Sequence, residues 1–243
     1  MDKINIFTFK WGDKYGPEYV NKLFDSLGRF VGFPFSFTCI TDDTDGLNSD
    51  IGVIDYLSFD PFDYPKHQIF TREKLVLMHK ANKGRNIWLD LDLLIHEDIT
   101  EEITKEIQKP TFIWNHWNPL PRSYDWYGKG ASCHVNSSFV MWDGNMGDDL
   151  WKLLTDFEEE AFFTYKSLDK FLFYQAHRKG MIDYWDEGFV SNYNREGFQK
   201  KGKISIFNTS HLKYNKGLVE VAYELDEVKE GWAHELWTNL SSA

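Results

Sequence analysis

Apolar and polar residues alternate from Ile4 to Phe9, and this period of two predicts a β-strand. After a loop with Gly12 and Gly16, the period lengthens to that of a helix, which we expect to begin at Pro17. Residues 86–91 form a third type of segment, an apolar run typical of a buried strand. The same criteria predict strands at 35–40 and 51–56 and a helix that Thr71 caps and Gly84 ends.

This strand–helix–strand–strand–helix–strand order predicts an α/β fold with a mostly parallel sheet and helices on both faces. Parallel sheets bind ligands at the carboxyl ends of their strands. We therefore expect the loops after Phe9, Ile40 and Leu89 to meet at one edge.

The second half of the chain is less regular. Its predicted elements are strands at 111–114, 135–142 and 205–207 and helices at 148–157, 167–178 and 231–240. A loop rich in Pro, Tyr and Trp, 119–132, contains Tyr124, Trp126 and Tyr127, which are candidates for an acceptor platform or lid. There is no internal repeat and no low-complexity linker, so we expect one domain over 1–243.

Composition narrows the partner classes. The net charge of −11 disfavours nucleic acid, whose binding needs a basic surface. Two cysteines make no disulfide framework, and no apolar run approaches the roughly 20 residues of a membrane span. We expect a soluble, cytoplasmic protein.

The clearest chemical signal is Asp90-Leu91-Asp92, which follows the apolar run and precedes another at Leu93. In an extended strand, residues two apart point the same way, so both carboxylates would share one face. Such a pair is a hard oxygen site for Mg²⁺ or Mn²⁺, completed by substrate phosphates. The alternatives are a solvated turn, a haloacid-dehalogenase-type phosphatase and a polymerase-like nucleotidyltransferase. The apolar flanks disfavour the solvated turn. The position of the motif along the chain disfavours the phosphatase, and the lack of an upstream Gly-Ser element disfavours the nucleotidyltransferase.

Several segments resemble those of a glycosyltransferase of the GT-A fold. The resemblance is to the retaining group that includes glycogenin and bacterial lipopolysaccharide galactosyltransferases, and to small bacterial and phage relatives. The segments that carry it, in order, are 8–21, 40–43, 72–75, the metal motif at 87–92, the donor-sugar strand at 136–142 and 167–170.

The resemblance implies a metal-dependent transfer of a sugar from a nucleotide-diphosphate sugar, most simply a UDP-sugar, to a glycan, lipid or protein acceptor with retention. It also implies a nucleotide-binding half at 1–95 and a sugar and acceptor half at 96–243. Mn²⁺ or Mg²⁺ would sit on Asp90 and Asp92. The donor would contact the residues Thr8, Phe9, Lys10, Tyr15, Asp42, Lys74, Leu91, Ser137 and Ser138.

Three residues have roles with a specific physical basis. Lys74, on the predicted helix before the metal motif, would bind the diphosphate as a point charge; the alternative is a solvated helix residue. Asn136 and Asp169 are the catalytic candidates: Asn136 to hydrogen-bond the sugar, Asp169 to hold the sugar or act as a base. The alternative for Asp169 is an acid in a helical first turn, which the helix dipole favours.

The chain departs from the family pattern at two places. Where the family has a His metal ligand, this chain has Asn208, with His211 three residues later and Lys213 as the expected phosphate-binding lysine. Asn208 and His211 are therefore the candidates for a third metal ligand, and the alternative is that this ligand is missing. Where the family often has Asp-Gln, this chain has Asp169-Lys170. A sugar-phosphate nucleotidyltransferase and a non-catalytic nucleotide-sugar-binding protein therefore stay as alternatives.

Overall fold

A computed structural model describes residues 3–59, 72–117, 133–165, 167–207 and 223–240. The chain forms two compact units and passes between them several times. We call them the β1 unit (2–57, 89–105 and 186–243) and the β7 unit (Met1, 58–88 and 106–185). Each unit is described by itself. The expected division at residue 95 and the single domain stay predictions.

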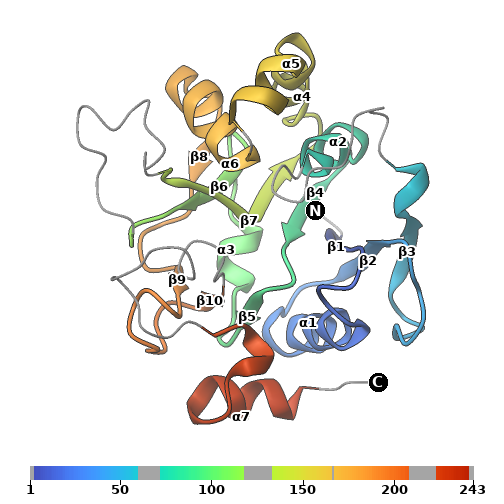
Figure 1. Ribbon diagram of the computed structural model, residues 1–243, viewed down its shortest axis with the longest axis vertical. Coiled ribbons are helices and arrows are strands. Elements are labelled where there is room, and N and C mark those ends of the chain that lie inside the picture. The colour runs from blue at the N-terminus through green and yellow to red at the C-terminus, as the bar shows by residue number, and fades with distance from the viewer. Residues whose placement is uncertain (1–2, 60–71, 118–132, 166, 208–222, 241–243) are drawn as a thin grey trace. The chain divides into compact units, whose positions relative to one another are not determined.

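The β1 unit contains three parallel strands in the order β3-β2-β1: β1 (Ile4–Lys10), β2 (Phe35–Thr41) and β3 (Gly52–Asp55). Between β1 and β2 lies α1 (Pro17–Phe30), which starts with proline as predicted and buries Val20, Leu23 and Leu27. These positions recur every three to four residues, so the helix presents one apolar stripe. Figure 1 shows α1 in blue beside β1 and β2.

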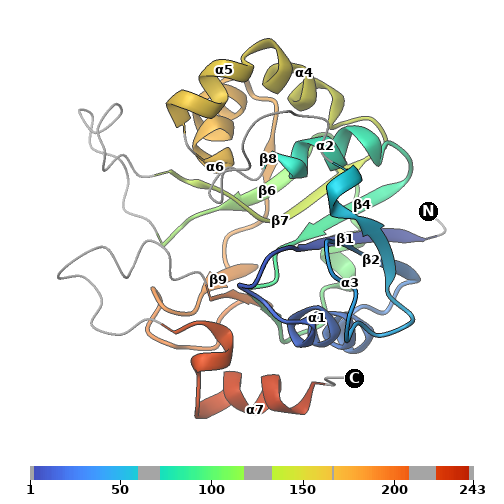
Figure 2. The ribbon, with the colours of Figure 1, turned by 45° about the vertical axis from the view of Figure 1, so that its right-hand side comes forward.

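A second sheet in the same unit has the order β5-β10-β9. Its strands are β5 (Leu93–Ile95), β9 (Val190–Asn192) and β10 (Ile204–Ile206), of which β10 is antiparallel to β5 and parallel to β9. The described part of the unit also contains the helices α3 (Thr100–Thr104) and α7 (Gly231–Asn239). The Trp237 ring of α7 packs 5.0 Å from the Tyr19 ring of α1, and the two helices lie side by side in Figures 1 and 2.

The β7 unit contains strands in the order β4-β7-β6-β8. They are β4 (Arg85–Leu89, whose last residue already belongs to the β1 unit), β6 (Thr111–Trp114), β7 (Val135–Asp143) and β8 (Asp183–Tyr184). β6 is antiparallel to β7 and parallel to β8. α2 (Glu73–Lys80) packs against α4 (Asp148–Asp156), and Figure 2 shows these two helices together.

The remaining helical segments of this unit include α5 (Glu158–Glu160) and α6 (Leu168–Phe171). The helix predicted at 167–178 is helical throughout, but it changes type along its length. α6 is followed by a π-helix, Leu172–Ala176, and a 3-10 turn, His177–Lys179. Gly180 ends it with φ +65°, a conformation that glycine adopts without strain.

The α/β fold with a mostly parallel arrangement is therefore confirmed, as are nearly all predicted strands and helices. The pattern missed the short elements β5, β8, β9 and α3. It extended the third strand to 56, whereas Tyr56–Ser58 is a 3-10 turn. Thr71, the expected cap of α2, lies outside the described residues, and Arg72 stands at the N-cap position.

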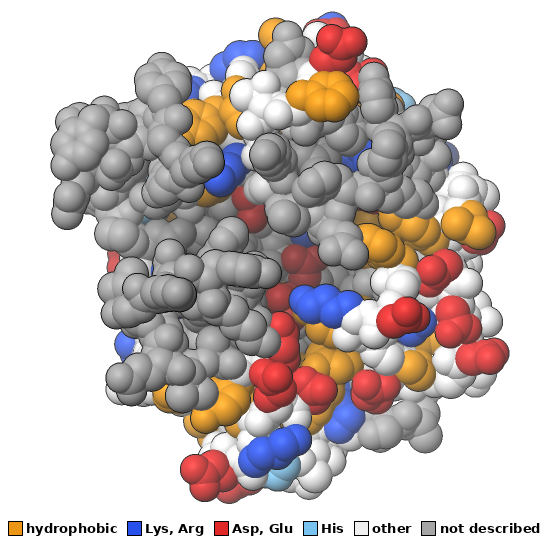
Figure 3. All heavy atoms as spheres, in the orientation of Figure 1, with side chains coloured by type: hydrophobic (Ala, Val, Ile, Leu, Met, Phe, Trp, Pro, Cys, Tyr) orange, Lys and Arg blue, Asp and Glu red, His pale blue; other side chains and the backbone are white. Residues whose placement is uncertain are grey.

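None of the described helices is long and apolar enough to cross a membrane. Cys39 and Cys133 are both free thiols. On the face in Figure 3, many Asp and Glu side chains are exposed from the centre of the view to its right-hand and lower parts.

Candidate functional site

In the β1 unit, the loops after β1 and β2 meet, as the strand order predicts. The Gly12 backbone N–H donates to Asp42 Oδ2 at 3.2 Å, and Gly12 has φ +65°, which favours glycine there. The Lys10 ammonium is 3.7 Å from Asp43 Oδ2 and donates to the Asp43 carbonyl at 3.4 Å. Two of the expected nucleotide contacts, Lys10 and Asp42, therefore tie these loops to each other.

The end of β4 joins the same edge of the β1 unit. The buried Thr8 hydroxyl donates to the Leu89 carbonyl at 2.8 Å, so Thr8 fixes the residue that immediately precedes the acidic pair. Such a hydrogen bond is worth about 1 kcal/mol. The expectation that the loops after Phe9, Ile40 and Leu89 come together is thus confirmed for the described residues.

The local geometry of the acidic pair differs from the prediction. β4 ends at Leu89, and Leu91 and Asp92 form a turn before β5 begins at Leu93. The two carboxylates are therefore not on one face of an extended strand, and that expectation was wrong. Asp90 is half-buried, whereas Asp92 is only 9% exposed and Leu91 is buried. The Phe207 N–H donates to the Asp92 carbonyl at 2.9 Å, which places the end of β10 beside the pair.

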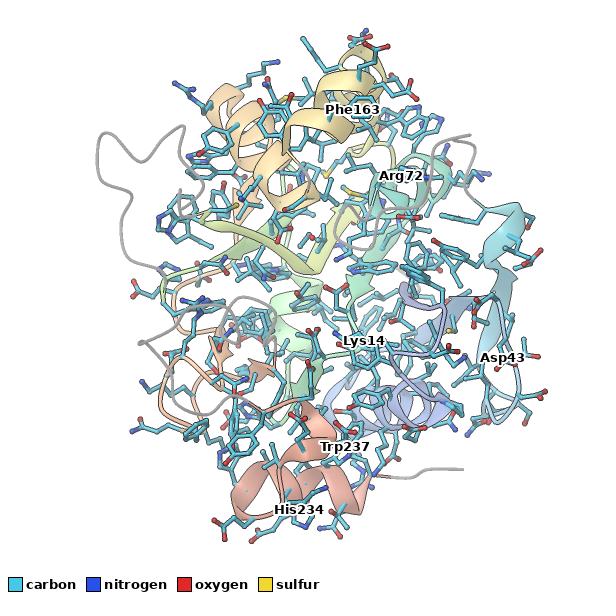
Figure 4. The ribbon with its side chains drawn as sticks, viewed as in Figure 1. Lys14, Asp43, Arg72, Phe163, His234 and Trp237 are labelled. Carbon is cyan, nitrogen blue, oxygen red and sulfur yellow. The ribbon has the colours of Figure 1, made fainter. Side chains whose placement is uncertain are left out.

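Tyr15 lies close to both carboxylates. Burial holds the pKa of its phenol well above the ordinary value, and the charges of Asp92, Glu224 and Asp90 raise it further. The Tyr15 hydroxyl therefore stays protonated and can donate a hydrogen bond near these carboxylates. The Lys14 ammonium donates to this hydroxyl at 2.5 Å, and Figure 4 shows Lys14 on the same loop. Glu224 was not a candidate from the sequence, since its position at this edge depends on long-range folding.

Aromatic rings line the beginning of the same loop. The Phe9 ring contacts the Tyr56 ring edge to face at 5.9 Å, and Trp11 stacks on Tyr56 at 5.7 Å. Phe9 is half-buried, so part of its surface packs in the protein and part is accessible. Trp11 and Tyr56 were missed by the sequence reasoning. The available signal was a tryptophan placed directly after the first strand.

In the β7 unit, a second group of predicted residues comes together around Ser137. The Lys74 ammonium donates to the Ser137 carbonyl at 2.9 Å and to the Ser137 hydroxyl at 3.2 Å. The Ser137 N–H donates to Asp169 Oδ1 at 3.1 Å, and the Ser138 N–H donates to Asn136 Oδ1 at 2.9 Å. Lys74 is 5% exposed, so the solvated alternative for this lysine is excluded.

Asp169 lies in the first turn of α6, where Ser167 Oγ caps the helix by accepting from the Lys170 N–H at 3.3 Å. The expected first-turn position is therefore confirmed. The Asp169 carboxylate also accepts from the Ser137 N–H of β7, so a first-turn position does not account for all contacts of this residue.

The described side chains offer a metal ion two carboxylates at the end of β4. Among the described residues there is no group of three or more His, Cys, Asp and Glu side chains that could hold a metal ion. Asn208, His211 and Lys213, like Tyr124, Trp126 and Tyr127, lie outside the described residues. A pair of carboxylate oxygens still fits Mg²⁺ or Mn²⁺, because these ions usually take one or two carboxylates and complete their shell with phosphate and water.

Comparisons with known proteins identify the fold. No family model and no curated protein matches the sequence. Among solved structures, the galactosyltransferase LgtC, crystallised with donor and acceptor sugar analogues, matches with a TM-score of 0.61 and 13% identity over 98% of this chain and 96% of its own. Mouse xyloside xylosyltransferase 1 matches with a TM-score of 0.56 and 13% identity over 85% of this chain and 98% of its own. The glycosyltransferase GlyE of Streptococcus pneumoniae TIGR4 matches with a TM-score of 0.57 and 14% identity, but over 60% of its own chain and 97% of this one.

At these identities the likeness establishes the fold, and the expected GT-A fold is confirmed. The site residues stay predictions, to be argued from chemistry.

Proposed function

We propose that this protein is a metal-dependent glycosyltransferase that takes a sugar from a UDP-sugar, with retention of configuration, and transfers it to a glycan acceptor. The observation that carries the proposal is the acidic pair, Asp90 and Asp92, at the end of β4, beside the loops that follow β1 and β2. The fold shared with three glycosyltransferases supports the reaction class.

The β1 unit suits the nucleotide and its phosphates. Asp90 and Asp92 would hold Mn²⁺ or Mg²⁺, which neutralises a diphosphate leaving group when bound. The protonated Tyr15 hydroxyl is a hydrogen-bond donor beside these carboxylates. The half-buried rings of Phe9 and Trp11 offer apolar faces for a base or ribose.

The β7 unit suits the sugar. Asn136 and Ser138 lie on β7, and polar side chains in an otherwise buried strand are typical of a ligand contact. Asp169 accepts a hydrogen bond from the N–H of Ser137, which lies between these two residues of the strand.

The test is release of UDP from UDP-glucose and UDP-galactose, with Mn²⁺ and with excess EDTA. Asp90→Asn and Asp92→Asn should each lower turnover at least about a hundredfold, because each removes a charged ligand of the ion. Asp50→Asn, an exposed carboxylate of the same unit, is the control and should retain wild-type activity. Full activity in EDTA would exclude metal dependence.

Formation of pyrophosphate from a sugar phosphate and UTP would instead identify a nucleotidyltransferase. Tight binding of UDP-sugars with no turnover over a range of acceptors would identify a binding protein.

A further inference from the structure

The strand β7 is irregular where Ser137 lies. In its pairing with β6, Asn136 is opposite Ile113 and Met141 is opposite Thr111. Four residues of β7, 137–140, therefore face one residue of β6, Phe112. Such bulges remove backbone groups from the ladder and redirect side chains, and they are frequent beside active sites.

Side chains take over the backbone groups of Ser137 in this bulge. Its carbonyl accepts from Lys74 at 2.9 Å and its N–H donates to Asp169 at 3.1 Å. One residue is thus held by a cation through its carbonyl and by an anion through its N–H. Both hydrogen bonds are assisted by charge, and such bonds are about twice as strong as neutral ones.

The contacts of Lys74 favour this arrangement. The ammonium group is buried on α2, 5.2 Å above the Trp88 ring, and a buried charge is tolerated only when it is hydrogen-bonded. The Ser137 carbonyl and hydroxyl supply two acceptors for it. Moving Ser137 would leave the ammonium group without these acceptors.

We propose that Lys74 and Asp169 are a pair of positioning residues that act through the backbone of Ser137 and thereby fix Asn136 and Ser138 for the donor sugar. The inference rests on the proposed function, since it assigns β7 to the sugar of the same donor. This role of Lys74 differs from the expected binding of the diphosphate, because the ammonium group binds Ser137 of β7 instead.

The experiment compares binding of UDP and of UDP-glucose and UDP-galactose, in Mn²⁺, by titration calorimetry. The variants are Lys74→Met, Asp169→Ala and the double variant. Each single variant should weaken UDP-sugar binding by about tenfold, the cost of one charge-assisted hydrogen bond, and change UDP binding less than about twofold. The double variant should lose no more UDP-sugar affinity than the single variant with the larger loss, because either substitution alone already releases Ser137.

Asp169→Asn distinguishes positioning from direct chemistry. Its amide oxygen can still accept from the Ser137 N–H, so this variant should recover most of the UDP-sugar affinity that Asp169→Ala loses. It also keeps the inference testable if Lys74→Met does not fold. Lys80→Met is the matched control, since Lys80 is on the same helix but donates to the Phe59 carbonyl at 2.6 Å.

Three results would overturn the inference. Equal losses for UDP and UDP-sugar in Lys74→Met would place Lys74 on the diphosphate. Additive losses in the double variant would make the two residues independent, and an Asp169→Asn variant as weak as Asp169→Ala would require the carboxylate itself. A wild-type protein that binds neither UDP nor UDP-sugar would instead refute the proposed function.

Discussion

Lowering the pH from about 7.5 to about 5 should destabilise the β1 unit through one histidine, His96. This side chain is 4% exposed, its Nε2 is 3.2 Å from the Ser205 hydroxyl, and the Trp232 ring packs edge to face at 5.0 Å. Its Nδ1 is buried and has no hydrogen-bond partner in the part of the chain that the structure describes. Burial, with a smaller effect of the Lys200 charge, lowers the pKa of His96 from 6.5 to about 4.

The sign follows from the two pKa values. Above 6.5 the imidazole is neutral in the folded and the unfolded chain, so its titration has no effect on stability. Between 6.5 and about 4 the unfolded chain takes up a proton that the folded chain does not, so the free energy of unfolding falls. The full difference of about 2.5 pKa units corresponds to about 3 kcal/mol, of which about 2 kcal/mol is lost by about pH 5.

Urea unfolding followed by tryptophan fluorescence at a series of pH values measures this effect. His96→Leu should make the loss of unfolding free energy between about pH 7.5 and pH 5 smaller by about 2 kcal/mol. Ser205→Ala is the control, because it removes the hydroxyl contact but leaves the imidazole buried, and it should keep the wild-type slope. If the free energy of unfolding fell equally with pH in wild type and in His96→Leu, the reasoning would be refuted.

Two further predictions concern hydrogen bonds in the β1 unit. Thr8→Val removes the donor to the Leu89 carbonyl and should lower the unfolding free energy by about 1 kcal/mol, whereas Thr8→Ser should restore it; equal stability of Thr8→Val and wild type in urea would contradict this. Asn194 is buried and its side-chain amide holds Tyr223 through two bonds, of 3.0 Å and 2.8 Å. Asn194→Ala should lower the free energy of unfolding by about 2–3 kcal/mol, whereas Asn145→Ala, at an exposed position, should leave it almost unchanged. Similar urea midpoints for these two variants would show that the hydrogen bonds between Asn194 and Tyr223 do not stabilise the protein.

The positions of the long elements followed from local pattern. The alternation at Ile4 to Phe9 and the helical period after Pro17 each specify an element within a few residues, and the structure has a strand and a helix at these positions. The acidic pair was also recognisable, because two carboxylates between apolar runs require a special environment. These signals are contained in neighbouring residues, so the sequence alone determined them.

The short strands β5, β8 and β9 could not be predicted in the same way. Segments of two or three residues carry too few positions for a period, and they are extended because a distant strand pairs with them. The turn at Asp90 to Asp92 has the same origin. Phe207, far along the chain, binds the Asp92 carbonyl, and this contact belongs to the tertiary structure.

The surroundings of the charged candidates were likewise decided by folding. From the sequence, Lys74 was either a phosphate ligand or a solvated helix residue, since a helix pattern does not reveal what a lysine faces. The tertiary structure buries its ammonium group against Ser137, a residue 63 positions later. Local sequence determines which residues can form a strand, a helix or a metal site, whereas long-range packing determines which charges are desolvated and which groups they bind.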